Sequence, residues 1–177
     1  MTAPATTKMT RLVVLLDGST SEAERQLPWA LLLSRSWQVP LTLLHVVEPA
    51  RTPHPVEVAM TEARDYFELV AWELRRQPDA PTIRTEVLDG LPDEEWRVFS
   101  ETNPGSVLML PGWAGDSVRG LRVRPVEELA AAFTTPVIVV PPIAVAPAKL
   151  QRIVVGTNGS PLAEGVLRGV RTDAATK

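Results

Sequence analysis

Five short apolar runs alternate with amphipathic segments along the chain. The runs are rich in valine, leucine and isoleucine and span residues 12–16, 41–47, 82–88, 106–111 and 136–141. The segments between them repeat apolar residues at three- and four-residue spacing, which predicts helices at residues 21–36, 56–76, 93–102 and 126–133. Strands that alternate with helices are typical of parallel βαβ units with right-handed crossovers. The pattern therefore predicts a doubly wound α/β domain, an open sheet of five parallel strands with helices on both faces.

Two of the runs are expected at the edges of this sheet. The third mixes polar with apolar positions, which favours a place near an edge. The fifth, PVIVVP, is β-branched and apolar, and such an exposed edge is a template for strand pairing. We therefore predict a homodimer through Val137, Ile138, Val139 and Val140. Two alternatives remain: the flanking prolines protect the edge of a monomer, or residues 153–155 cover it.

The chain repeats part of itself after the fifth run. RLVVLLDGS, which begins at Arg11, aligns without a gap with RIVVGTNGS, which begins at Arg152. A second helical pattern follows the second copy, and residues 143–150 between the copies are proline-rich. We predict an α/β domain at residues 10–142, a linker at 143–150 and a partial second repeat of one strand and one helix at 151–177.

Composition narrows the classes of function. A length of 177 residues suits one full domain, and a net charge of −3 argues against a nucleic-acid surface built on bulk charge. The chain has no cysteine, its two histidines lack metal-ligand spacing with acids, and no apolar run approaches bilayer length. We expect a cytoplasmic protein with no metal and no membrane contact. Four tryptophans in helical segments are expected to pack on the sheet or in an interface, namely Trp29, Trp37, Trp72 and Trp96.

Candidate binding residues follow two of the runs. Asp17, Gly18 and Ser19 come directly after the first, and Gly112 and Gly115 follow the fourth. Ligands of open parallel sheets bind beyond the carboxyl ends of the strands. A carboxylate can hold ribose or adenine, and glycines let backbone N–H groups approach phosphates. The spacing alone equally fits a helix cap and a tight turn.

These residues resemble those of the universal stress protein family over about residues 10–142. The resemblance implies a five-stranded α/β sheet, and we predict the order 3-2-1-4-5. ATP-binding members share a signature of Gly, two residues, Gly, nine residues, then Gly and Ser or Thr, whose first two positions are filled here by Gly112 and Gly115. The resemblance also implies that Asp17 contacts the nucleoside and that Val47, which ends the second run, lies beside the base.

The phosphate end of that signature is altered. Pro125 and Val126 stand where Gly and Ser or Thr belong, so an N–H donor and a hydroxyl are lost. Glu127 and Glu128 follow and would compete with an anion at the start of the next helix. Three nearby arginines offer phosphate contacts that could compensate, although a solvated basic stretch is the simpler interpretation: Arg119, Arg122 and Arg124.

Two functions from different classes follow. The first is a regulatory, stress-response protein with a degenerate adenine-nucleotide site that holds ATP or AMP weakly and acts through protein partners. The alternative is a dimeric scaffold that binds no nucleotide. An adenylyl-transfer enzyme fits less well, because the chain shows no pyrophosphate loop and no general base. We therefore predict that the chain is not an enzyme.

Overall fold

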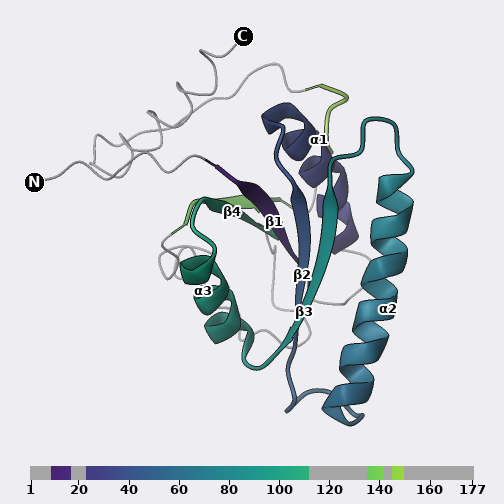
Figure 1. The fold of residues 1–177 in the computed structure, drawn as a ribbon, viewed down its shortest axis with the longest axis vertical. Helices are drawn as coiled ribbons and strands as arrows, with labels where there is room; N and C mark the ends of the chain where they lie inside the picture. The colour runs from purple at the N-terminus through teal and green to yellow at the C-terminus, as the bar shows by residue number, and fades with distance from the viewer. Residues whose placement is uncertain (1–8, 17–22, 112–134, 142–144, 150–177) are drawn as a thin grey trace, which may run out of the picture.

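The computed structural model describes residues 9–16, 23–111, 135–141 and 145–149. Within them the strands and helices alternate as the sequence predicts (Figure 1). The strands are β1 (Arg11–Leu16), β2 (Leu41–Val47), β3 (Ile83–Asp89), β4 (Ser106–Pro111) and β5 (Val137–Val140). The helices are the 3-10 turn η1 (Ala23–Gln26), α1 (Leu27–Trp37), α2 (Val56–Arg75) and α3 (Pro92–Thr102). The predicted helix at 126–133 and the partial repeat at 151–177 lie outside the described residues.

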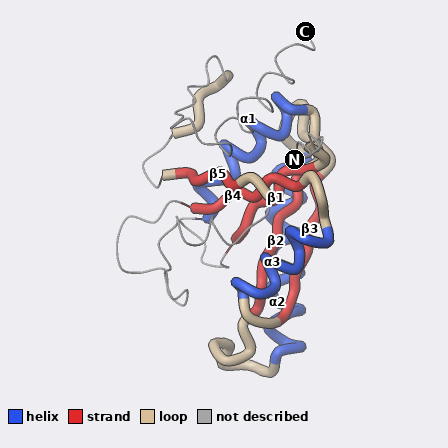
Figure 2. Tube along the Cα trace, turned by 90° about the vertical axis from the view of Figure 1, so that its left-hand side faces the viewer, coloured by secondary structure: helices blue, strands red, loops and turns tan. Residues whose placement is uncertain are grey.

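The five strands form one sheet in the order β3-β2-β1-β4-β5, and every pairing is parallel. Figure 2 shows them following one another from β5 across to β3. Both the fold class and the order 3-2-1-4-5 are confirmed. In this sheet β3 and β5 are the edges, and most side chains of β3 are half-buried whereas most of those of β2 are buried. The mixed polarity of the third run therefore reports its edge position, as expected.

Helices cover both faces of the sheet, and each face has its own core. On one face α1 and α2 pack against alternate residues of β1 and β2. The strand residues Leu12, Val14 and Leu43 are fully buried there, and Phe67 of α2 is 2 % exposed. On the other face α3 contributes Trp96 and Phe99, which pack against Val13, Leu15 and Leu44. Figure 1 shows α3 on the opposite side of the strands from α2. Because neighbouring side chains of a strand point to opposite faces, a central strand covered on both faces is apolar along most of its length.

Prolines set several element boundaries, and one of them corrects a predicted helix. Residues 21–36 were expected to form a single helix, but the described part divides into η1 and then α1. Pro28 has no N–H, so it is tolerated in the first turn of an α-helix and not in its interior. The α-helix therefore begins at Leu27. Similarly, Pro92 opens α3, and β5 ends before Pro141.

The tryptophans divide into two groups. Trp96 is buried in the core beside α3, and Trp29 and Trp37 pack partly against the core on the other face. The expectation of packing is confirmed for these three. Trp72 differs, since its side chain lies on the outer face of α2 with 53 % of its surface exposed. It packs neither on the sheet nor in the core.

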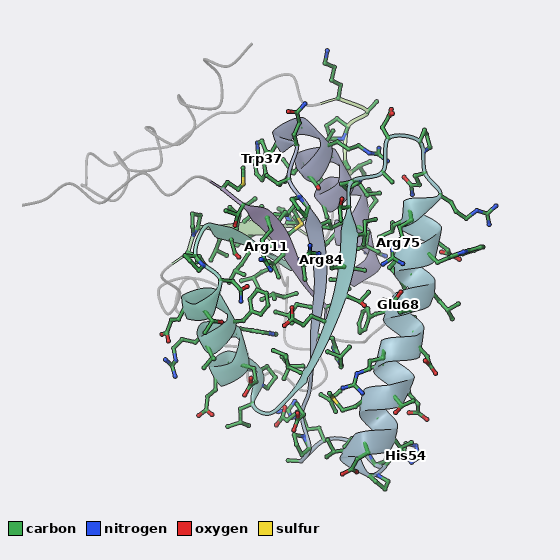
Figure 3. The ribbon with its side chains drawn as sticks, viewed as in Figure 1. Arg11, Trp37, His54, Glu68, Arg75 and Arg84 are labelled. Atoms are coloured by element: carbon green, nitrogen blue, oxygen red, sulfur yellow. The ribbon has the colours of Figure 1, made fainter. Side chains whose placement is uncertain are left out.

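A polar cluster fastens α2 to the edge strand β3. The Glu68 carboxylate accepts a hydrogen bond from the Thr85 hydroxyl and lies 3.2 Å from Arg75 Nη1. The Arg75 Nη2 atom donates to the Ile83 carbonyl at 2.9 Å. Figure 3 shows Glu68 and Arg75 between the helix and the sheet. Thr85 and then Arg75 hold the pKa of Glu68 below its ordinary value, because both stabilise the charged carboxylate.

This cluster predicts a small acid-sensitive part of the stability. A carboxylate with a lowered folded pKa stabilises the fold above its unfolded pKa of about 4.3, and the contribution is lost as pH falls through the folded pKa. We expect Glu68→Gln to cost about 1 kcal/mol or less at pH 7, since the pair is largely exposed, and to cost progressively less as pH falls through the folded pKa of Glu68. Urea unfolding of both chains from pH 7 to pH 3 measures this. A difference that stays constant with pH would contradict it.

Candidate functional site

The carboxyl ends of β1, β2 and β4 lie at the same end of the parallel sheet. Leu16, the last residue of β1, pairs with His45 of β2, and Val14 pairs with Met109 of β4. The chain first moves from β1 out to β3 and then returns to the other side of β1 as β4. The strand order therefore reverses between β1 and β4, which is where open parallel sheets bind ligands. The prediction that the first and fourth strands are neighbours is confirmed.

Most of the predicted binding residues lie outside the described part of the chain. These are Asp17, Gly18, Ser19, Gly112 and Gly115. Asp17 follows Leu16 directly, and Gly112 follows Pro111, so each continues one of two adjacent strand ends.

Val47 is described, and its carbonyl is already in use. Its side chain is 6 % exposed, and its carbonyl oxygen accepts a hydrogen bond from the Gly90 N–H at 3.1 Å. A carbonyl oxygen has two lone pairs, so one remains for a ligand. Gly90 has φ +145°, and a Cβ there would lie 2.7 Å from the Glu95 carboxylate. A glycine is therefore needed where β3 ends beside Val47.

His45 holds the end of β1 in place. Its Nδ1 atom lies 2.8 Å from the Leu16 carbonyl oxygen, and a carbonyl can only accept, so Nδ1 carries the proton and donates. The ring also contacts Phe67 of α2, with centroids 5.2 Å apart. His45 is therefore a strand residue whose ring is satisfied by its neighbours. The sequence pattern did not show that the carbonyl it binds is the one immediately before Asp17.

Gln26 is a polar side chain that the sequence pattern did not single out. It is 1 % exposed, and within the described part of the chain neither its amide oxygen nor its amide nitrogen has a hydrogen-bond partner. It belongs to η1, which contacts both β1 and β4. A buried amide without partners costs about 1–3 kcal/mol, and it can both donate and accept. The signal was present in the sequence: Gln26 is the one polar position in a helical series that continues with Ala30, Leu33 and Trp37.

Acidic side chains gather where β2 and β3 end. Glu48 follows β2 and lies 2.8 Å from Arg51, which offsets its charge. Asp89 ends β3, and the first turn of α3 adds Asp93, Glu94 and Glu95. These carboxylates complement the positive end of the α3 dipole. They also add negative charge at the carboxyl ends of β2 and β3, which disfavours a polyanionic ligand there.

Among the described residues no group of three or more histidines and acids could hold a metal ion. No helix within the same residues has the length and apolar character needed to cross a membrane.

Comparison with known proteins identifies the family. The sequence profile of the universal stress protein family matches residues 9–141. No curated protein sequence matches the chain significantly. Among solved structures, universal stress protein UspA from Lactobacillus plantarum has a TM-score of 0.59 at 20% identity, over 75% of this chain and 98% of that one.

Two other solved structures agree on the fold. A universal stress protein family member from Burkholderia pseudomallei has a TM-score of 0.56 at 20% identity, over 75% of this chain and 96% of that one. A universal stress protein solved in complex with cAMP has a TM-score of 0.51 at 18% identity, over 76% of this chain and 98% of that one. With the profile covering most of the chain and the sheet order matching, this protein belongs to the universal stress protein family.

Proposed function

We propose that this chain is a stress-response regulatory protein that binds an adenine nucleotide weakly at the carboxyl ends of β1, β2 and β4. The observation that carries the proposal is the adjacency of β1 and β4, because in the sequence Asp17 directly follows the last residue of β1 and Gly112 directly follows the last residue of β4. A related universal stress protein is solved with cAMP, which supports an adenine ligand for this fold. In this proposal the protein is a cytoplasmic binding protein and not an enzyme.

The nucleoside half of the site is the stronger half. Asp17 supplies a carboxylate for ribose or adenine, and the free lone pair of the Val47 carbonyl supplies an acceptor for an exocyclic amine. The phosphate half lacks the N–H at Pro125 and the hydroxyl at Val126. The carboxylates that end β2 and β3 and open α3 add an unfavourable field for phosphates. We therefore expect affinity to depend little on the number of phosphates.

Calorimetry with adenosine, AMP and ATP, with magnesium present, tests this function. We expect all three to bind about equally and weakly, with dissociation constants of roughly 100 μM or above. Asp17→Asn should weaken all three by about tenfold to a hundredfold, because a charged hydrogen bond to the nucleoside contributes about 1.5–3 kcal/mol. Glu57→Gln, an exposed acid at the start of α2, is the matched control and should change nothing. ATP binding at low micromolar concentration would contradict the degenerate site.

A dimeric scaffold without nucleotide is the second candidate. The edge strand β5 favours it, since Val139 is 39 % exposed and Val137 and Ile138 are half-buried on a strand that pairs with β4 alone in the described sheet. In this candidate Val137–Val140 pairs with the same strand of a second chain. If adenosine, AMP and ATP all fail to bind to the native chain, the scaffold is the better account.

A further inference from the structure

The outer face of α2 carries a regular stripe that the core does not use. Its members recur at alternating four- and three-residue spacing: Val58, Glu62, Asp65, Leu69, Trp72 and Arg76. At about 100° per residue they fall within an arc of about 80°. The buried residues of the helix, which include Met60, Phe67 and Leu74, lie on the opposite side. Leu69 is 65 % exposed and Trp72 is 53 % exposed, so the centre of the stripe is apolar where a solvated helix face would be polar.

The spacing of the stripe is that of a helix that pairs with another helix. Alternating steps of three and four place one residue of every turn along a single seam, which is the pattern of two-stranded packing. Figure 1 shows α2 as a long helix at the side of the sheet, beyond β3. Arg76, the residue that caps α2, keeps helical dihedral angles (φ −79°, ψ −11°), so the seam extends through it.

The charges along the seam are ordered so that the seam complements itself. Acids lie before the apolar pair, at Glu62 and Asp65, and a base lies after it, at Arg76. Two such helices running in the same direction would place like charges together. Running antiparallel, with Leu69 of each helix opposite Trp72 of the other, they bring each Asp65 level with Arg76 of the partner. Glu62 lies one turn before Asp65 and adds negative charge near Arg76 of the other helix.

We propose that α2 pairs antiparallel with α2 of a second copy of this chain. Two symmetric layers of Leu69 against Trp72 form the centre, and an Asp65–Arg76 ion pair closes each end. This surface is distinct from the β5 strand, which lies at the other edge of the sheet.

Trp72 and Arg76 are already arranged for this contact within one chain. The Arg76 guanidinium lies 4.5 Å from the centroid of the Trp72 ring. The stack orders both side chains, which lowers the entropy lost on pairing. A guanidinium that stacks through its face keeps the N–H groups of its edge free to bind a carboxylate.

The size of the surface sets its strength. The seam from Asp65 to Arg76 is about 16 Å long at 1.5 Å per residue. A single pair of helices of that length buries less than the roughly 800 Å² per partner of a standard interface. The proposed pairing is therefore weak and reversible, with a dissociation constant on the order of 100 μM.

Sedimentation velocity from about 10 μM to about 500 μM tests the pairing, because this range spans the expected dissociation constant. The average mass should rise with concentration, from whatever state the chain holds at the lowest concentration. Asp65→Arg alone and Arg76→Asp alone should each abolish the rise, since each puts like charges opposite one another in both end layers. The double variant Asp65→Arg/Arg76→Asp should restore it, because the charges are exchanged and remain complementary.

Mixing the two single variants provides the sharpest result. The Asp65→Arg chain has arginine at both end positions, and the Arg76→Asp chain has aspartate at both. Neither should associate with itself, but an equal mixture should associate with an affinity equal to or above that of the native chain. An effect of the substitutions on folding or general charge would not produce association on mixing.

Arg64→Asp is the matched control, since it makes the same charge change as Arg76→Asp at an exposed position of α2 away from the seam. It should leave the rise in mass unchanged. Thermal unfolding of every variant confirms that the fold is kept. No rise for the native chain up to 500 μM would overturn the proposal, as would single variants that fail to associate on mixing. Nucleotide binding does not enter this test, so its outcome is independent of the proposed function.

Discussion

Replacing Pro125 by glycine and Val126 by serine is expected to increase affinity for ATP and to leave affinity for adenosine unchanged. The glycine restores a backbone N–H donor and the serine restores a hydroxyl, at the positions where the family signature has both. A hydrogen bond to a charged group contributes about 1.5–3 kcal/mol. Each restored bond therefore corresponds to an increase of about tenfold to more than a hundredfold in ATP affinity.

Isothermal calorimetry on four chains separates the two contributions. The native chain, Pro125→Gly, Val126→Ser and the double variant are each titrated with adenosine, AMP and ATP. Adenosine serves as the internal control, because it has no phosphate to meet the restored groups. A gain for adenosine equal to that for ATP would show that the substitutions act on the nucleoside half instead. Equal absence of ATP binding in all four chains would reject the nucleotide site.

Phe67→Ala is expected to lower the free energy of unfolding by about 3–5 kcal/mol. Phe67 is 2 % exposed and lies in the core between α2 and the sheet. Its ring contacts His45 and Tyr66, with centroids 5.2 Å and 5.1 Å away. Alanine would leave a cavity beside His45, the residue that holds the end of β1. Stability is therefore lost through packing on both the sheet side and the helix side of the ring.

Urea unfolding at low micromolar concentration measures this effect. Leu69→Ala is the control, because Leu69 lies one turn or less away on the same helix and is 65 % exposed. At a concentration where chains do not associate, it should change the free energy of unfolding by about 0.5 kcal/mol or less. Similar losses for the two variants would mean that α2 does not pack on the sheet through Phe67.

Most of the fold could be predicted because the sequence patterns that specify it lie within short segments of the chain. Five apolar runs separated by helical periodicity leave few topologies, since crossovers between parallel strands have one hand and need a covering helix. β1 and β2 are apolar at most of their positions, with His45 as the polar residue that meets α2, and β3 shows its edge position by carrying Arg84 and Glu86. The start of α1 at Leu27 was also readable in principle, because Pro28 lacks the N–H that a helix interior requires.

The candidate site could be predicted only as residue types at strand ends. Asp17 and Gly112 are 95 residues apart in the chain by number, and nothing local to either states that they continue adjacent strands. The sheet order decides it. In the same way, a histidine in an apolar run predicts a satisfied side chain but does not name the Leu16 carbonyl as its partner. A glutamine at the start of a helix does not reveal that its amide is buried and has no hydrogen-bond partner among the described residues.

What the sequence by itself determined is the set of elements, their parallel arrangement and the altered residues of the phosphate signature. These follow from periodicity, proline chemistry and side-chain type, each of which acts within a few residues. Only the tertiary structure decided that Trp72 and Leu69 face solvent while Phe67 faces the sheet, and that Val47 shares its carbonyl with Gly90. Exposure and hydrogen-bond partners depend on which distant surfaces pack together, and packing is a property of the whole fold.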